Sequence, residues 1–178
     1  MMVKFRSSAL AALATLGLSV PAAATLPEPP QAAATQQALA FLHHAGAGDV
    51  FEITTSMVAV QKSNNAQVRA FARMLIDHHT TLSNAALDAA KAGGVMPPPP
   101  ELSAQQKAMI GTLMQTAPAS FDRVYLQQQV PAHQMALQLN QGYARSGDNP
   151  SLRQAATSAL PRIQEHLTQA QQLLSQAR

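Results

Sequence analysis

The sequence predicts an all-α protein, a four-helix bundle of the ferritin-like type, with one long crossover between the second and third long helices. Composition is the first indication, because the apolar share is largely Ala and Leu and the main polar residue is Gln, which all favour helices. Four long segments also carry apolar residues at alternating three- and four-residue steps. No run of β-branched residues alternates with polar ones, so no strand is expected. A chain of 178 residues fits one domain.

Residues 1–24 are predicted to be a secretory signal peptide. Lys4 and Arg6 supply a basic start, and the apolar run over 9–20 is too short to cross a bilayer of about 30 Å. Small residues up to Ala24 suit cleavage after that position, although a retained N-terminal anchor is the alternative. Residues 25–34 are then a Pro-containing linker and residues 35–176 the bundle. We therefore expect an exported protein, periplasmic or associated with the envelope.

Charge and cysteine content exclude several functional classes. The chain has 12 Lys and Arg against 9 Asp and Glu, and removal of Lys4 and Arg6 leaves 10 against 9. Such a near-neutral chain gives no basis for binding nucleic acid. No hydrophobic span follows residue 24, so no integral membrane segment is expected in the mature chain. The absence of Cys excludes disulfides, thiolate metal sites and a cysteine nucleophile.

The first half of the bundle should be a helical hairpin. Its first helix is predicted over about 33–62 and its second over about 66–92, separated by the polar break at 63–65. The paired glycines at 93–94 suit the end of the second helix. The apolar stripe of that helix consists of Val68, Phe71, Leu75, His78, Leu82, Ala85 and Ala89.

The second half should be another hairpin, reached through a long connection. That connection holds an extended run of prolines at 97–100 and a short helix over about 103–115, with Ser103 as its N-cap. The third long helix is predicted over about 120–146 and the fourth over about 151–176, with a turn at 147–150. Pro131 and Pro161 lie inside these helices and should kink them. Two tight hairpins joined by one crossover are typical of ferritin-like bundles.

Three histidines occupy the apolar stripes of separate helices and are therefore expected to face the core. They are His78, His133 and His166, on the second, third and fourth long helices. At about 1.5 Å rise per residue, they and Glu52 fall in one layer within roughly 5 Å. Three imidazoles and a carboxylate, from Glu52 or Asp77, could hold zinc, copper or iron. The other histidines, His43, His44 and His79, are expected to be solvated or half-buried.

A second interpretation of these residues needs no metal. Buried imidazoles can be satisfied by Gln, Asp or an internal water, and Asp77 can pair with Arg73 four residues earlier. Asp122, Tyr125 and Gln129 form a polar stripe on the third long helix. They are expected either to support the metal ligands or to form a hydrogen-bonded cap near the end of the bundle.

Sequence motifs of common enzymes are absent. The chain has no Glu-x-x-His pair, which di-iron ferritin-like proteins use on two helices, and no Gly-rich phosphate loop or G-x-S-x-G elbow. Ferroxidase chemistry of the usual di-iron kind is therefore not expected.

Several of these segments together resemble the bacterial family DUF4142, a domain of unknown function. The resemblance rests on 71–79 (FARMLIDHH), 121–126 (FDRVYL), His133, the Leu160–Pro161 step, and Glu52 followed by 62–64 (KSN). It implies a ferritin-like bundle exported to the bacterial envelope. By position, the polar signature of the family falls on Glu52, Asp77, His78, Asp122, Tyr125, His133 and His166. The family has no agreed activity.

Three functions remain open from the sequence. The leading one is a metal-binding bundle, not primarily an enzyme, with His78, His133 and His166 as ligands and Glu52 or Asp77 as the carboxylate. The second is a structural or protein-interaction module of the envelope, in which the same residues form a buried hydrogen-bond network. The third is a redox enzyme that uses a metal with an open coordination position.

Overall fold

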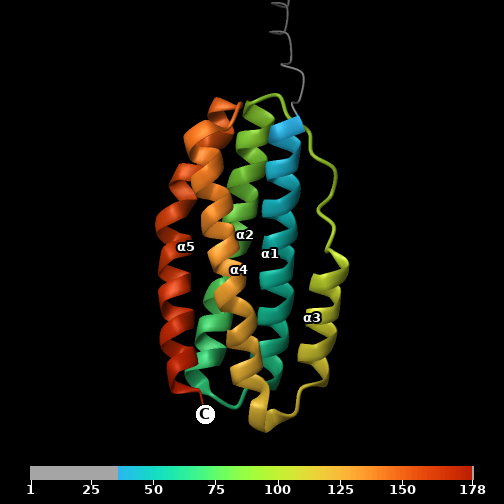
Figure 1. Cartoon of the computed structure of the whole chain (residues 1–178), viewed down its shortest axis with the longest axis vertical. Helices are drawn as coiled ribbons and strands as arrows, with labels where there is room; N and C mark the ends of the chain where they lie inside the picture. The colour runs from blue at the N-terminus through green and yellow to red at the C-terminus, as the bar shows by residue number, and fades with distance from the viewer. Residues whose placement is uncertain (1–35, 178) are drawn as a thin grey trace, which may run out of the picture. The chain divides into compact units, whose positions relative to one another are not determined.

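The structure is a computed structural model that describes residues 36–177, and this part of the chain is all-α with five helices and no strand. The helices are α1 (Gln36–Lys62), α2 (Ala66–Ala92), α3 (Ala104–Gln115), α4 (Pro118–Ser146) and α5 (Pro150–Gln176) (Figure 1). The predicted all-helical class is confirmed. The predicted signal peptide at 1–24 and the linker at 25–34 lie outside the described residues.

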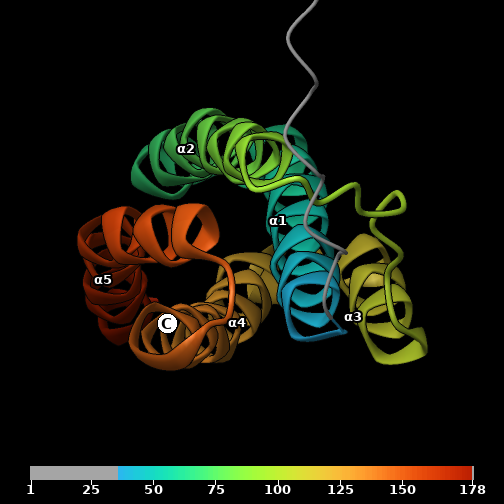
Figure 2. The same cartoon turned by 90° about the horizontal axis from the view of Figure 1, so that it is seen from above.

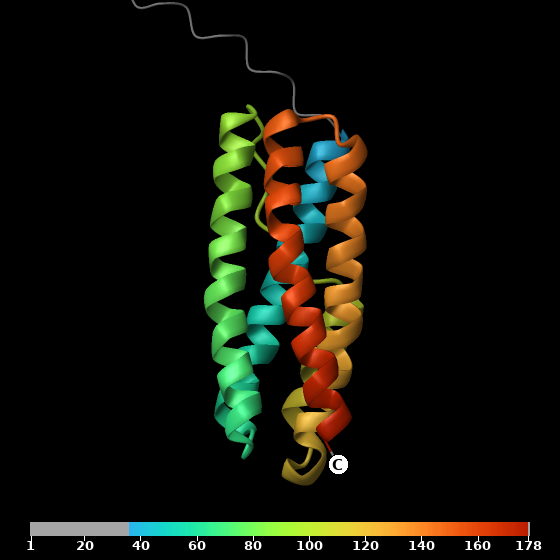
Figure 3. The ribbon, with the colours of Figure 1, turned by 90° about the vertical axis from the view of Figure 1, so that its left-hand side faces the viewer.

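Two hairpins account for the four long helices. Helix α1 packs against α2 and α4 against α5, and the hairpins meet through α2 with α5 and α1 with α4. Seen from above, these four helices surround a common interior, and α3 lies outside them beside α1 (Figure 2). A side view shows α2 and α5 running in opposite directions next to each other (Figure 3). The long connection that carries α3 lets α2 and α4 run in the same direction (Figure 1).

Local sequence signals fix the helix ends. The Asn65 side chain caps α2 by accepting from the backbone N–H of Gln67 at 2.8 Å. Beyond α2, Gly94 adopts a φ of 71°, a conformation that glycine reaches without steric cost. Ser103 and Gln106 form a capping box at the start of α3. Asn149 caps α5 through Leu152.

Two apolar clusters stabilise opposite ends of the long helices. The cluster at one end includes Phe71, Phe121 and Leu126, together with Leu113, which anchors α3. The cluster at the other end includes Phe41, Leu42, Ala90, Tyr143, Leu152 and Ala156. Polar side chains occupy the interior between them. Among the described helices, none combines the length and apolar character needed to cross a membrane.

Pro131 and Pro161 lie inside α4 and α5, and both helices continue through them. A proline cannot donate the usual backbone hydrogen bond, so each leaves a carbonyl one turn earlier without its helical donor. Both side chains are exposed, and Pro131 lies two residues before a buried histidine.

Candidate functional site

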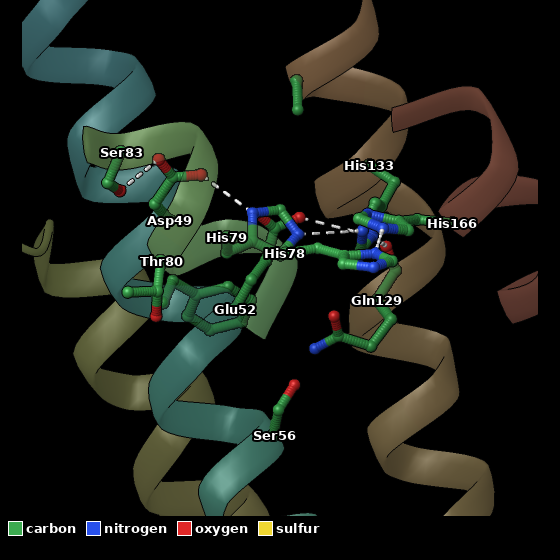
Figure 4. A network of polar contacts seen from close by, with 12 residues as sticks. Asp49, Glu52, Ser56, His78, His79, Thr80, Ser83, Gln129, His133 and His166 are labelled. Carbon is green, nitrogen blue, oxygen red and sulfur yellow. Dashed lines mark hydrogen bonds and ion pairs between the residues drawn. The ribbon is translucent and has the colours of Figure 1, made fainter. Parts of the chain in front are cut away.

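Three histidine rings from three helices meet in the polar layer between the two apolar clusters. They are His79 on α2, His133 on α4 and His166 on α5, and none is more than 1% exposed. Their ring centroids lie 5.2 to 5.4 Å apart in every pairing. One ring nitrogen from each residue falls within 4.8 Å of the others (Figure 4). Such spacing suits a shared ion or a shared proton.

Two carboxylates of α1 hold the ring of His79. Its Nδ1 atom lies 2.8 Å from Oδ1 of Asp49 and 3.3 Å from Oε2 of Glu52 (Figure 4). The other Asp49 oxygen accepts from the Ser83 hydroxyl at 2.6 Å. Nδ1 therefore carries a proton, and Nε2 lies 3.4 Å from Nε2 of His133. Burial lowers the pKa of His79, but the charge of Glu52 and the hydrogen bond to Asp49 outweigh it and raise the pKa above its ordinary value.

The ring of His133 is oriented by its own helix. Its Nδ1–H donates to the backbone carbonyl of Gln129 at 2.9 Å, which leaves Nε2 to face His79. Oε1 of Glu52 lies 3.3 Å from the same Nδ1 but makes no hydrogen bond, although it is buried. A buried carboxylate oxygen that accepts no hydrogen bond is costly. The electrostatic contact with the His133 ring offsets part of this cost for Oε1 of Glu52.

The ring of His166 has one partner and one free nitrogen. Its Nε2 lies 2.9 Å from Nδ1 of His78, and the two rings stack with centroids 5.2 Å apart. Nδ1 of His166 is buried and has no hydrogen-bond partner. Burial, followed by the neighbouring histidines His79, His133 and His78, lowers the pKa of His166 to about 2. This ring therefore stays neutral, and one of its two nitrogens carries a lone pair.

The three rings share one chemical feature. In each, one nitrogen contacts an outer partner, namely Asp49 for His79, the Gln129 carbonyl for His133 and His78 for His166. The other nitrogen is left toward the cluster. Metal-binding histidines commonly show this arrangement, because the outer hydrogen bond fixes the tautomer and the ring orientation.

The sequence-predicted ligands divide into two groups. Glu52, His133 and His166 are buried and brought together. His78 is only half-buried and contacts the cluster through His166, while Asp77 is exposed and lies outside the cluster. The expectation that His79 is solvated or half-buried is wrong, since it is 1% exposed. The spacing of Leu75 and His79 turns the second histidine of the pair, not the first, fully into the core.

The three predicted supporting residues of α4 lie at increasing distance from the rings. The Gln129 carbonyl contacts His133, and its side-chain amide donates to the Thr55 hydroxyl at 2.9 Å. Tyr125 is fully buried with its hydroxyl 2.8 Å from that of Ser56, and burial raises its pKa. Asp122 is half-buried, and its Oδ1 is a buried atom without a hydrogen-bond partner.

Two residues of the cluster were not predicted, Asp49 and Ser83. A signal for Asp49 existed, because Asp49, Glu52 and Ser56 recur at three and four residues and so share one face of α1. Ser83 follows His79 by four residues on α2 and shares a face with it in the same way. Both spacings become informative only once His79 is known to face inward.

A cavity of about 1030 Å³ reaches this cluster. Its lining includes Asp49, Glu52 and His79, and extends along all five helices on the side of the Phe41 and Tyr143 cluster. Small molecules can therefore approach the carboxylates from solvent, whereas His133 and His166 are not part of the lining.

The fold and site define an all-helical protein with a buried histidine cluster supported by carboxylates. The chain belongs to the family described as a domain of unknown function, DUF4142, whose model matches residues 23–173. No functionally curated protein matches the chain.

Two solved structures are similar to the fold. One is a DUF305 fragment from Deinococcus radiodurans, with a TM-score of 0.70 and 15% identity, covering 80% of this chain and 98% of that chain. The other is CopM in its Cu(I)-bound form, with a TM-score of 0.67 and 18% identity, over the same shares of the two chains. At these identities the likeness concerns the fold alone.

Proposed function

We propose that this protein binds one transition-metal ion through His79, His133 and His166. The observation that carries the proposal is the convergence of three buried imidazoles from three helices, with one nitrogen of each within 4.8 Å of the others. The partnerless Nδ1 of His166 supports it, because an ion would give this buried atom the partner that it lacks.

The donor set favours particular metals. Imidazole nitrogen suits zinc and copper well, and three protein ligands leave a coordination position for a further group. The similar structure of CopM is that of its Cu(I)-bound form, and this makes Cu(I) the first ion to test. Zinc is the second and iron the third.

This proposal changes the roles expected from the sequence. His79 replaces His78 as a ligand, and His78 becomes a positioning residue that holds Nε2 of His166 at 2.9 Å. Asp49 holds His79, and Glu52 contacts both His79 and His133. Asp77 has no part in the proposed centre. The two carboxylates would offset part of the charge of the bound ion.

We further propose that the four long helices act as a ferritin-like bundle, with α3 as an accessory helix, in the periplasm or envelope after export. Support for export comes from the basic and apolar pattern of residues 1–24. The competing function is a structural or interaction module. In that case the chain of contacts from Asp49 through His79 to His133 and Gln129 links these side chains without an ion.

Metal content of tag-free protein distinguishes these functions. Protein loaded with Cu(I) under anaerobic conditions, or with Zn(II), and then desalted should retain about one equivalent by elemental analysis. His133→Ala should lose most of it. His44→Ala is the matched control, because His44 is an exposed histidine outside the cluster, and it should retain the wild-type amount.

Retention below about one-tenth equivalent in the folded wild type would contradict the proposal and favour the metal-free network. The same conclusion would follow if His133→Ala kept its metal while His44→Ala lost it. Circular dichroism of each variant establishes that any loss of metal does not reflect a loss of helical structure.

A further inference from the structure

The cavity beside the histidine cluster is unusually rich in small apolar side chains. Alanines from α1, α2, α4 and α5 form much of its wall, among them Ala47, Ala86, Ala136, Ala155 and Ala159. Larger apolar groups complete it, including Phe51, Leu139 and Ile163. A volume of about 1030 Å³ is at the upper end of the range found for small-molecule sites. An apolar wall of this size favours an apolar occupant over water.

Apart from histidines, the charged side chains that line the cavity are all acidic. Four of the nine acidic residues of the chain contribute to its lining, namely Asp49, Glu52, Asp88 and Glu101. No Lys or Arg occurs among the described residues that line it. Even with His79 protonated, the inner pair of carboxylates carries an excess negative charge. Low-dielectric walls strengthen the field of such a group, so the cavity should select cations.

We propose that this cavity binds an amphiphilic amine, a molecule with an apolar body and a protonated amino group. The body would lie against the alanine-rich wall and the ring of Phe51. The ammonium group would face Asp49, whose carboxylate is half-buried and accessible from the cavity. Phe41 and Phe51 also line the cavity, and aromatic rings attract cations.

The cavity shares Asp49, Glu52 and His79 with the surroundings of the proposed metal, but amine binding does not require an ion. His133 and His166 do not line the cavity, and the carboxylates that attract the amine are present with or without an ion. The test therefore uses the metal-free full chain, so that failure of one proposal leaves the other standing.

Fluorescence of N-phenyl-1-naphthylamine, a neutral apolar probe, measures occupancy of the cavity. Decylamine, decanol and decanoate, used below their micelle concentrations, then compete for it. We expect the probe to bind, and decylamine to displace it at a concentration at least about tenfold lower than decanoate, with decanol between them. In Asp49→Asn, the concentrations at which decylamine and decanoate displace the probe should become more similar, and the probe should still bind.

Filling the cavity provides the second test. Ala136→Phe and Ala155→Phe place a ring inside it from different helices, and each should weaken probe binding by about tenfold or more. Ala108→Phe is the matched control, because Ala108 is exposed on α3 outside the lining, and its probe binding should equal that of the wild type. Helical content measured for all three variants shows whether they fold.

Three results would overturn the proposal. The first is the absence of probe binding to folded wild type. The second is wild-type probe binding by both folded cavity-filling variants, which would place the probe elsewhere. The third is displacement by decanoate at the same concentration as decylamine, or a lower one, which would exclude selection of an amine.

Discussion

The Nε2 atoms of His79 and His133 lie 3.4 Å apart in an interior where neither ring is more than 1% exposed. At this distance two imidazole nitrogens can share one proton, or can both bind one ion, but two bare lone pairs would repel each other. Glu52 and Asp49 raise the pKa of His79 against the effect of burial, which favours a proton between the rings in the metal-free protein. A proton and a metal ion therefore compete for the same position.

The contacts of Glu52 predict a large stability cost when His79 is removed. Glu52 is 1% exposed and contacts the two rings of His79 and His133 at 3.3 Å. In His79→Ala its charge loses a buried partner, and we expect the free energy of unfolding to fall by about 3–5 kcal/mol. Urea unfolding of metal-free protein at neutral pH measures this.

Two further variants separate charge from packing. His44→Ala removes an exposed ring and should change the unfolding free energy by no more than about 0.5 kcal/mol. Adding Glu52→Gln to His79→Ala should recover part of the loss, because a neutral amide is cheaper to bury than an unpaired carboxylate. A double variant less stable than His79→Ala would show that Glu52 does not depend on this ring.

Sequence spacing predicted the helices well because each long helix buries one continuous stripe. The range of about 66–92 for the second helix coincides with α2, and Ser103 caps α3 as expected. These features depend on local chemistry, in which an Asn or Ser side chain accepts from a nearby backbone N–H. Such signals do not require knowledge of the neighbouring helices.

Local sequence signals could not predict which of the adjacent residues His78 and His79 is buried in the core. His78 and His79 lie 100° apart around α2, and both fall near the edge of an apolar stripe that drifts along the helix. Packing decides between them, since α1 places Asp49 and Glu52 opposite His79, and α5 leaves His78 beside His166. Contacts between residues 27 or more positions apart determine the site, and spacing within one helix cannot supply them.

Opposite pKa shifts in two rings predict a stability maximum for the metal-free protein near the unfolded histidine pKa of about 6.5. The pKa of His166 is about 2, so below pH 6.5 the unfolded chain binds a proton that the folded chain does not, and stability falls as pH decreases. The pKa of His79 is raised, so above pH 6.5 the folded chain holds the extra proton. The stability that this extra proton contributes is then lost as pH rises through the pKa of His79 in the folded chain.

Urea unfolding at several pH values measures both sides of this maximum. Each proton contributes a slope of at most about 1.4 kcal/mol per pH unit. His166→Gln should flatten the acidic side between pH 6.5 and 5, and His79→Gln should flatten the alkaline side. Stability that rises steadily from pH 6.5 to 8 in the wild type would contradict the assignment of a proton to His79.

Competition between the proton and the metal predicts that metal affinity increases with pH. Binding through Nε2 of His79 requires loss of the proton that its raised pKa retains, so the affinity should rise by up to about tenfold per pH unit until the folded pKa is passed. Titration against a chelator of known affinity at pH 6, 7 and 8 measures this dependence. Asp49→Asn removes one of the groups that raise the pKa, and should make the dependence shallower. An affinity that does not change with pH, or a dependence as steep in Asp49→Asn as in the wild type, would show that the ion does not displace this proton.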